Sequence, residues 1–190
     1  LLGQASLIAM EEPVRELDGE YARYWHGWIL PLRILLMFFS YDDIRFIGMA
    51  LQYCLIVCMF LLMQKKEILN YGVGLFVMLM FICPIVSCIS LEYTFIFYIS
   101  TISSIFILRF HKKLVEKKLY MYVFLLIGMS TSYFDFLTYP VVALGMPLLF
   151  LLILLQEDMI NCKRKIQYTI CCSVMWGIGY IGFWGIKWII

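Results

Sequence analysis

The sequence predicts an all-α integral membrane protein, with about six transmembrane helices plus an N-terminal interfacial or re-entrant helix. Two observations support this prediction. Of the 190 residues, 64% are hydrophobic and only 15% are charged, whereas soluble domains average about 45–50% and about 25%. Aromatic residues make up 17% of the chain, and Tyr and Trp crowd the ends of its apolar runs, as in membrane-interface belts. The net charge of +2 is too small to indicate nucleic-acid binding.

Apolar runs long enough to cross a bilayer recur along the chain. A helix rises 1.5 Å per residue, so about 20 mainly apolar residues cross a hydrocarbon core of about 30 Å. Pro84 interrupts the second run near its end, and Pro140 is placed to open the fifth helix. The predicted spans are residues 44–63, 69–86, 92–110, 119–130 with an extension toward 136, 140–155 and 166–190.

The N-terminal part of the chain differs from these spans. Residues 1–23 are mixed and acidic, and we expect an outer loop there. Residues 24–40 are apolar but contain Pro31 and Arg33. A central Arg costs roughly 2.5–3.5 kcal/mol on insertion scales, so an interfacial helix is favoured over the alternative, a tilted span. We expect residues 44–190 to form the transmembrane bundle and the whole chain to be one membrane domain, part of a longer protein.

Positive charge falls on every second connection between the predicted spans. The positive-inside rule therefore places these connections in the cytoplasm of a multi-pass cell-membrane protein, with the acidic N-terminal segment outside. Binding of anionic lipid by Lys117 and Lys118 is the alternative to a purely topological role. The ten cations are Lys65, Lys66, Arg109, Lys112, Lys113, Lys117, Lys118, Lys163, Arg164 and Lys165.

The spacing of glycines and the absence of several catalytic and metal-binding motifs further limit the possible packing and chemistry of the chain. Gly179, Gly182 and Gly185 recur every three residues in the last span, which favours close helix packing within the chain. None of the seven cysteines forms a CxxC motif, which disfavours zinc and thioredoxin chemistry. The chain has no nucleophile elbow, phosphate-binding glycine loop, HExxH or dinucleotide fingerprint, so nucleotide chemistry is not expected.

Charged groups at a membrane boundary are costly unless they are wet or paired, so the predicted outer face holds the candidate site. Asp18, Glu20 and Asp135 are the candidate catalytic carboxylates, and Asp18 with Glu20 suits a divalent metal ion as well as a base. The alternatives are a solvated loop for Asp18 and Glu20, and helix capping before Pro140 for Asp135.

Four further residues complete the candidate site as substrate-binding groups. Arg23 suits a phosphate because its guanidinium is planar and forked, and His26 follows in the same segment. Glu92 precedes a predicted helix, where the helix dipole alone would also favour an acid. Tyr133 lies in the aromatic run that contains Asp135. We expect Asp18, Glu20, Arg23, Glu92 and Asp135 to converge on one outward-facing cavity.

Three stretches resemble a group of bacterial multi-pass proteins that are themselves similar to membrane glycosyltransferases of the GT-C superfamily. They are EYARYWHGWILPLRILLMFF (20–39), LEYTFIFY (91–98) and STSYFDFLTYPVVALGMPL (130–148). The resemblance implies a many-helix fold whose large first outer loop carries a catalytic acid and leads into interfacial helices. It also implies a sugar donor held on a polyprenyl phosphate. Residues 1–40 would match the end of that loop, with Asp18 or Glu20 as the acid.

The function expected from the sequence is transfer of a sugar from a polyprenyl-phosphate donor to a saccharide or protein acceptor on the outer side. The lipid bilayer is the other expected partner. Two rivals belong to different classes. A transporter or flippase for a lipid-linked saccharide predicts charges near the bilayer midplane and related halves of the chain, whereas the charges here lie at the predicted boundaries. A non-catalytic cell-envelope assembly subunit predicts that the outer acids are individually dispensable.

Overall fold

The computed structural model describes residues 25, 27–82, 91–134 and 139–189. Every regular element within these ranges is helical, which confirms the predicted all-α class there. The elements are α3 (Ile29–Leu36), α4 (Tyr41–Lys65), the 3-10 turn η1 (Leu69–Tyr71), α5 (Gly72–Ile82), α7 (Leu91–Glu116), α8 (Tyr120–Phe134), α9 (Pro140–Glu157) and α10 (Cys162–Ile189).

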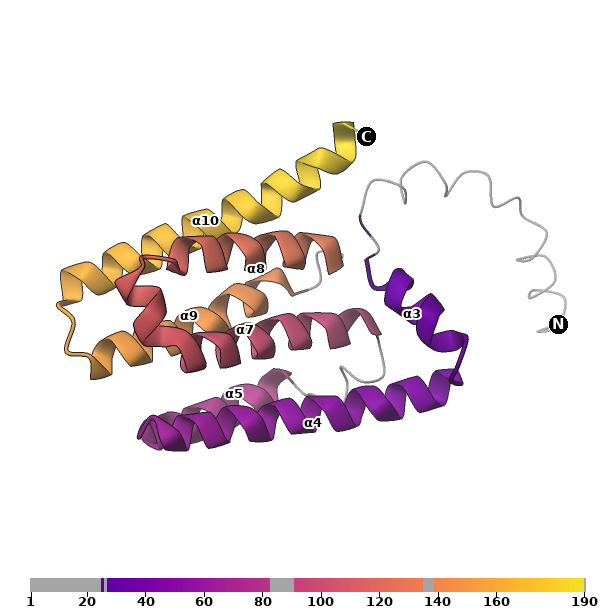
Figure 1. The fold of residues 1–190 in the computed structure, drawn as a ribbon, viewed down its shortest axis with the longest axis horizontal. Helices are drawn as coiled ribbons and strands as arrows, with labels where there is room; N and C mark the ends of the chain where they lie inside the picture. The colour runs from indigo at the N-terminus through magenta and orange to yellow at the C-terminus, as the bar shows by residue number, and fades with distance from the viewer. Residues whose placement is uncertain (1–24, 26, 83–90, 135–138, 190) are drawn as a thin grey trace, which may run out of the picture.

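The long helices lie in one bundle, in which α4, α7 and α9 run in one direction and α8 and α10 in the other (Figure 1). Helix α7 packs against α4, α8 and α9, and α10 packs mainly against α8. Helices α4 and α10 therefore form opposite edges of the bundle, with α7, α8 and α9 between them (Figure 1). Their outward faces are apolar and exposed, for example at Phe46, Val57 and Ile178. Such faces suit lipid contact rather than water.

Four of the helices are long and apolar enough to cross a membrane: α4, α7, α9 and α10. Helix α8 has 15 residues and is about 22 Å long, less than a hydrocarbon core of about 30 Å. Helix α5 has 11 residues, and the rest of its predicted span, 83–86, lies outside the described residues. Membrane helices are thus found where the sequence predicts them, but four rather than six reach spanning length among the described residues.

The helices reach further into the basic segments than predicted. Residues 109–116 belong to α7, and residues 163–165 form part of the first turn of α10. The sequence analysis had treated these residues as connections. Lys and Arg are good helix formers, and no Pro or Gly interrupts either segment. The positive charges therefore extend the helices beyond their apolar parts instead of ending them.

Helices α4, α7 and α9 end in the same way. In each, the residue after the last turn has a positive φ: 59° at Glu67, 53° at Lys118 and 55° at Met159. The next amide bonds back five residues, as from Leu119 N–H to the Leu114 carbonyl at 2.9 Å. This is the Schellman motif, which normally uses Gly at the left-handed position. The three turns lie at the same end of the bundle (Figure 1), so the cations around them share that end.

Helix α4 begins with a capping box. The Ser40 hydroxyl accepts the Asp43 N–H at 3.3 Å, and the Asp43 carboxylate accepts the Ser40 N–H at 3.1 Å. The two side chains thus satisfy backbone donors that the first helical turn leaves free. Asp42 lies in the same turn and pairs with Arg45 at 3.6 Å. Asp42 and Asp43 therefore belong to the start of the helix rather than to a loop.

Hydroxyl groups inside the bundle bond to their own helices. The Thr101 hydroxyl donates to the Phe97 carbonyl, Ser104 to Ser100 and Thr131 to Ile127, each at 2.7 Å. A Ser or Thr can in this way satisfy its hydroxyl on the preceding turn without a partner from another helix. These buried hydroxyls consequently form no polar path through the described part of the bundle.

Two glycines allow α8 and α10 to approach closely. A Cβ atom on Gly128 would overlap the Trp176 carbonyl, and one on Gly179 would overlap the Leu125 carbonyl. Close backbone approach of this kind is the usual role of small residues between membrane helices. The packing predicted for the glycines of the last span is therefore correct at Gly179. It is wrong at Gly182 and Gly185, where an added Cβ would meet no atom within 4 Å.

The close approach of α8 and α10 predicts opposite effects for two matched substitutions. Gly179→Ala should destabilise the protein by about 1–3 kcal/mol, because a backbone carbonyl cannot move away as a side chain can. Gly182→Ala should be neutral or stabilising by up to about 1 kcal/mol, since alanine favours a helix over glycine. Thermal unfolding in detergent, followed by circular dichroism, measures both. Equal unfolding temperatures for the two variants would contradict the close contact of α8 and α10 at Gly179.

Candidate functional site

Most of the residues predicted for the site lie where the structure makes no statement. Asp18, Glu20, Arg23, His26 and Asp135 are outside the described residues, and Glu92 is placed only as the second residue of α7. Their predicted convergence on one cavity therefore stays a prediction. Tyr133 is described, half-buried in the last turn of α8. It provides the starting point for the site.

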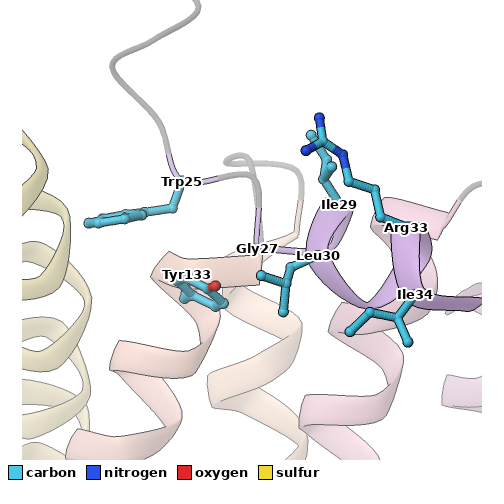
Figure 2. Close-up of a pocket in the computed structure, with 7 residues that line it drawn as sticks. All are labelled: Trp25, Gly27, Ile29, Leu30, Arg33, Ile34 and Tyr133. Atoms are coloured by element: carbon cyan, nitrogen blue, oxygen red, sulfur yellow. The ribbon is translucent and has the colours of Figure 1, made fainter.

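Tyr133 lines a cavity of about 480 Å³ between the end of α8 and the start of α3. Trp25 and Gly27 line it from the segment before α3. Figure 2 shows Trp25 to one side of Tyr133 and the α3 residues to the other. The remaining lining residues are Ile29, Leu30, Arg33 and Ile34, all of α3.

An aromatic cluster joins this cavity to α10. The Trp25 Nε1–H donates to the Phe183 carbonyl at 3.2 Å, and its ring lies 5.9 Å from that of Tyr133 and 5.6 Å from that of Phe183. The Lys187 ammonium lies 4.6 Å from the centre of the Trp25 ring, a cation–π contact. The segment that precedes α3 is thus held against both α8 and α10.

Gly27 brings the chain into direct contact with the end of α8. Its N–H donates to the Tyr133 carbonyl at 3.0 Å. A Cβ at this position would lie 2.6 Å from that carbonyl oxygen and would also overlap the Tyr133 ring. Real Cβ atoms do not approach other heavy atoms so closely, so only glycine fits here. Gly27 therefore sets the distance between α3 and α8, and with it the width of the cavity.

Arg33 gives the cavity its positive charge. Its side chain is exposed, and in Figure 2 its guanidinium rises from α3, away from the ring of Tyr133. No carboxylate among the described residues pairs with it. A free guanidinium offers five N–H donors in a planar fork that matches a phosphate. Arg33 entered the sequence-based prediction only as an obstacle to membrane crossing, and its place in the wall of a cavity was not predicted.

The opposite side of α3 carries an apolar groove. Pro31, Leu32 and Leu35 line a second cavity, of about 320 Å³, together with residues of α4 and α7. The Tyr98 hydroxyl donates to the Gly48 carbonyl at 3.0 Å and joins those two helices across the groove. The other lining residues are Ile44, Ile47, Gly48, Leu51, Thr94, Phe95 and Tyr98. Helix α3 thus separates a cavity with a cation from a groove that is almost wholly apolar.

A buried polar network lies at the other end of the bundle, and the sequence analysis missed it. His111 Nδ1 lies 2.5 Å from the Tyr120 hydroxyl, and its Nε2 lies 2.6 Å from the Asp158 carboxylate. His111 is 2% exposed and Tyr120 is 1% exposed. Asp158 is 47 residues from His111 along the chain, so no local motif could reveal the pair. The network satisfies a buried imidazole and joins α7 and the start of α8 to the turn after α9.

A metal site is not seen among the residues that the structure describes. No group of three His, Cys, Asp or Glu side chains lies close enough within those ranges to hold an ion. Asp18 and Glu20, the pair suggested for a divalent metal, are not among them. The described part of the candidate site therefore offers a cation, aromatic rings and apolar surface. These groups bind and orient a ligand but do not supply a base.

The role of Gly27 predicts a local change on substitution. Gly27→Ala should push α3 away from α8, because the added methyl group overlaps both the carbonyl and the ring of Tyr133. Hydrogen exchange of the amides in residues 27–36 should become faster. Gly48→Ala is the matched control, since its Cβ would meet only the Tyr98 hydroxyl, at 3.4 Å. Unchanged exchange in the Gly27 variant would show that α3 does not depend on this contact.

Comparison with known proteins found no relative: no family model, curated protein or solved structure matches the chain. The chemistry of the site must therefore be inferred from its own residues.

Proposed function

We propose that the chain is a GT-C-like membrane glycosyltransferase, which moves a sugar from a polyprenyl-phosphate donor to a saccharide or protein acceptor on the outer side of the membrane. The observation that carries the proposal is the pair of cavities on either side of α3. One is lined by aromatic rings and by Arg33, which pairs with no carboxylate among the described residues, and the other is apolar. A polyprenyl-phosphate sugar has the same division, with a charged head and a long apolar tail.

Each cavity has a role in holding the donor. Arg33 binds the phosphate through charge-assisted hydrogen bonds, and the groove beside Leu32 and Leu35 takes the first isoprene units of the tail. Trp25 and Tyr133 present ring faces and polar edges to the sugar, as interfacial aromatics do. Helix α3 then lies at the interface, with its charged residue toward the headgroups. This placement explains why an arginine is retained in an apolar segment.

The transfer step uses residues of the outer segments. A carboxylate among Asp18, Glu20 and Asp135 takes the proton of the acceptor hydroxyl, whose oxygen attacks the anomeric carbon. The bond from that carbon to the phosphate oxygen breaks, and the phosphate leaves with the electron pair. Arg23 and Arg33 stabilise the charge that develops on the leaving group. Asp135 follows Tyr133 by two positions in the sequence, which favours it as the base.

The interior of the bundle favours an enzyme over a transporter. A transporter needs polar groups near the membrane midplane that face a pathway. The buried hydroxyls of α7 and α8 instead bond to their own helices, as at Thr101 and Thr131. The buried His111 lies at the basic end of the bundle within a satisfied network.

The orientation of the bundle follows from the positive charges. The turns after α4, α7 and α9 share one end (Figure 1), and we assign that end to the cytoplasm by the positive-inside rule. The cavity beside α3 lies at the opposite end, near the end of α8 and the C-terminal part of α10. The site then faces outward, as required for a donor displayed on the outer leaflet.

Cysteine labelling tests this orientation. In a variant without native cysteines, single cysteines at Lys65, Lys113 and Arg164 should resist a membrane-impermeant thiol reagent added to intact cells. Cysteines at Asp43 and Asp135 should react, because they belong to the opposite boundary. All five should react after the cells are opened, which controls for burial. Labelling at position 113 in intact cells would overturn the assignment.

Binding and transfer can be separated by two substitutions in the reconstituted chain. Arg33→Gln should weaken binding of polyprenyl phosphate by about ten- to a hundredfold, since a hydrogen bond to a charged group contributes about 1.5–3 kcal/mol. Arg45→Gln is the matched control, because Arg45 pairs with Asp42 and lines neither cavity. Asp135→Asn should leave this binding unchanged and abolish sugar transfer from polyprenyl-phosphate mannose.

The outcomes distinguish the proposed enzyme from its rivals. A non-catalytic assembly subunit should form no glycosylated product in this reconstituted system, either as the unmodified chain or as Asp135→Asn. A transporter should move the lipid-linked sugar between leaflets without forming a new glycosidic bond. Equal binding by the Arg33 and Arg45 variants would remove the basis for placing the donor phosphate beside α3.

A further inference from the structure

A third cavity lies at the basic end of the bundle, remote from α3. Its volume is about 540 Å³, and it opens between the start of α8 and the first turns of α10. Two cations line it: Lys118 from the turn before α8, and Arg164 from the first turn of α10. No carboxylate is among its lining residues. It is thus a positively charged cavity at the end of the bundle opposite to the proposed catalytic site.

The two cations are available to a ligand. Lys118 and Arg164 are both exposed, and neither pairs with a carboxylate among the described residues. The neighbouring Lys165 differs, because its ammonium donates to the Gln156 side chain. Helices α8 and α10 begin here, so their free N–H groups and dipoles add to the positive potential. The potential and the unpaired donors together favour a phosphate.

The cavity changes in character with depth. Along α10 it is lined by Arg164, then by Gln167 and Tyr168, and then by Cys171. Seven residues of helix separate the first from the last, about 10 Å along the axis. Met121 adds an apolar side chain from α8. The order along α10, from a charged group through an amide and a phenol to a thiol, matches an amphiphile that enters with its apolar end inward.

Rigid packing keeps this cavity open. Tyr120 forms one wall, and its hydroxyl is held by His111, which in turn contacts Asp158 after α9. The rings of Tyr120 and Tyr168 meet edge to face at 6.1 Å between centres. Lys118 occupies the left-handed position of the turn, with φ 53°. Glu67 and Met159 occupy the same left-handed position in the turns after α4 and α9.

We propose that this cavity binds the phosphate of an anionic phospholipid from the leaflet at the basic end of the bundle. Lys118 and Arg164 hold the phosphate, and Met121 and Cys171 contact the first apolar carbons of the lipid. Basic pockets between membrane helices are known to suit such headgroups. The proposal is independent of glycosyltransferase activity, because it concerns the opposite end of the bundle and a lipid that is not consumed.

Native mass spectrometry of the full chain, titrated with phosphatidylglycerol or phosphatidylcholine, tests the site. The unmodified chain should prefer phosphatidylglycerol. The double variant K118A/R164A should bind it about 25-fold more weakly, at about fivefold for each cation. The matched control is K65A/K66A, which removes the same charge from the same end but from residues that do not line the cavity. The charge-conserving K118R/R164K should retain binding, which separates loss of the site from loss of the fold.

Three results would overturn the proposal. Equal weakening by K118A/R164A and K65A/K66A would mean diffuse attraction to the charged end. Equal binding of phosphatidylcholine would mean that the charge of the lipid is not recognised. Displacement of phosphatidylglycerol by inorganic phosphate at the same concentration would assign the cavity to a free anion instead of a lipid.

Discussion

Backbone hydrogen bonding in a medium without water is the constraint on which the rest of the structure depends. An unsatisfied N–H or C=O costs several kcal/mol in lipid, so a spanning segment must satisfy these groups within itself. Helices do so, and in the described bundle the hydroxyls of Thr101, Ser104 and Thr131 follow the same rule by bonding to the preceding turn. The exposed cations that line cavities, Arg33, Lys118 and Arg164, lie instead at the two ends.

The two ends differ because different constraints act on them. At the basic end, Schellman turns close α4, α7 and α9, and the contact between the buried His111 of α7 and Asp158 connects α7 to the turn after α9. At the other end, α3 is held by one short contact through Gly27 and by the aromatic cluster around Trp25. The contacts at the basic end thus hold several helices together around a charged cavity. The other end has a single short helix between two cavities, which suits a site that must admit a substrate.

The glycines show how one residue type serves different purposes in this fold. Gly128 and Gly179 bring α8 and α10 together along their length, and Gly27 brings the start of α3 against Tyr133. At each position a methyl group would meet a backbone carbonyl, which cannot turn aside. Gly182 and Gly185 follow Gly179 at the same three-residue interval, but an added Cβ at either position would meet no atom within 4 Å. Spacing alone does not distinguish them, because it does not show which helix is near.

Composition and the length of the apolar runs determined the helical membrane class, the positions of the helices and the alternation of charge, because each is a local property of the chain. Tertiary structure decided what lies together. From the sequence, Arg33 was only an obstacle to membrane crossing, whereas α3 places it in the wall of a cavity that Tyr133 also lines. Asp158 became the partner of His111 across 47 residues. It also decided where helices end, since α7 continues to Glu116 through a basic segment. Side-chain contacts between distant segments depend on packing, which no periodicity in the sequence encodes.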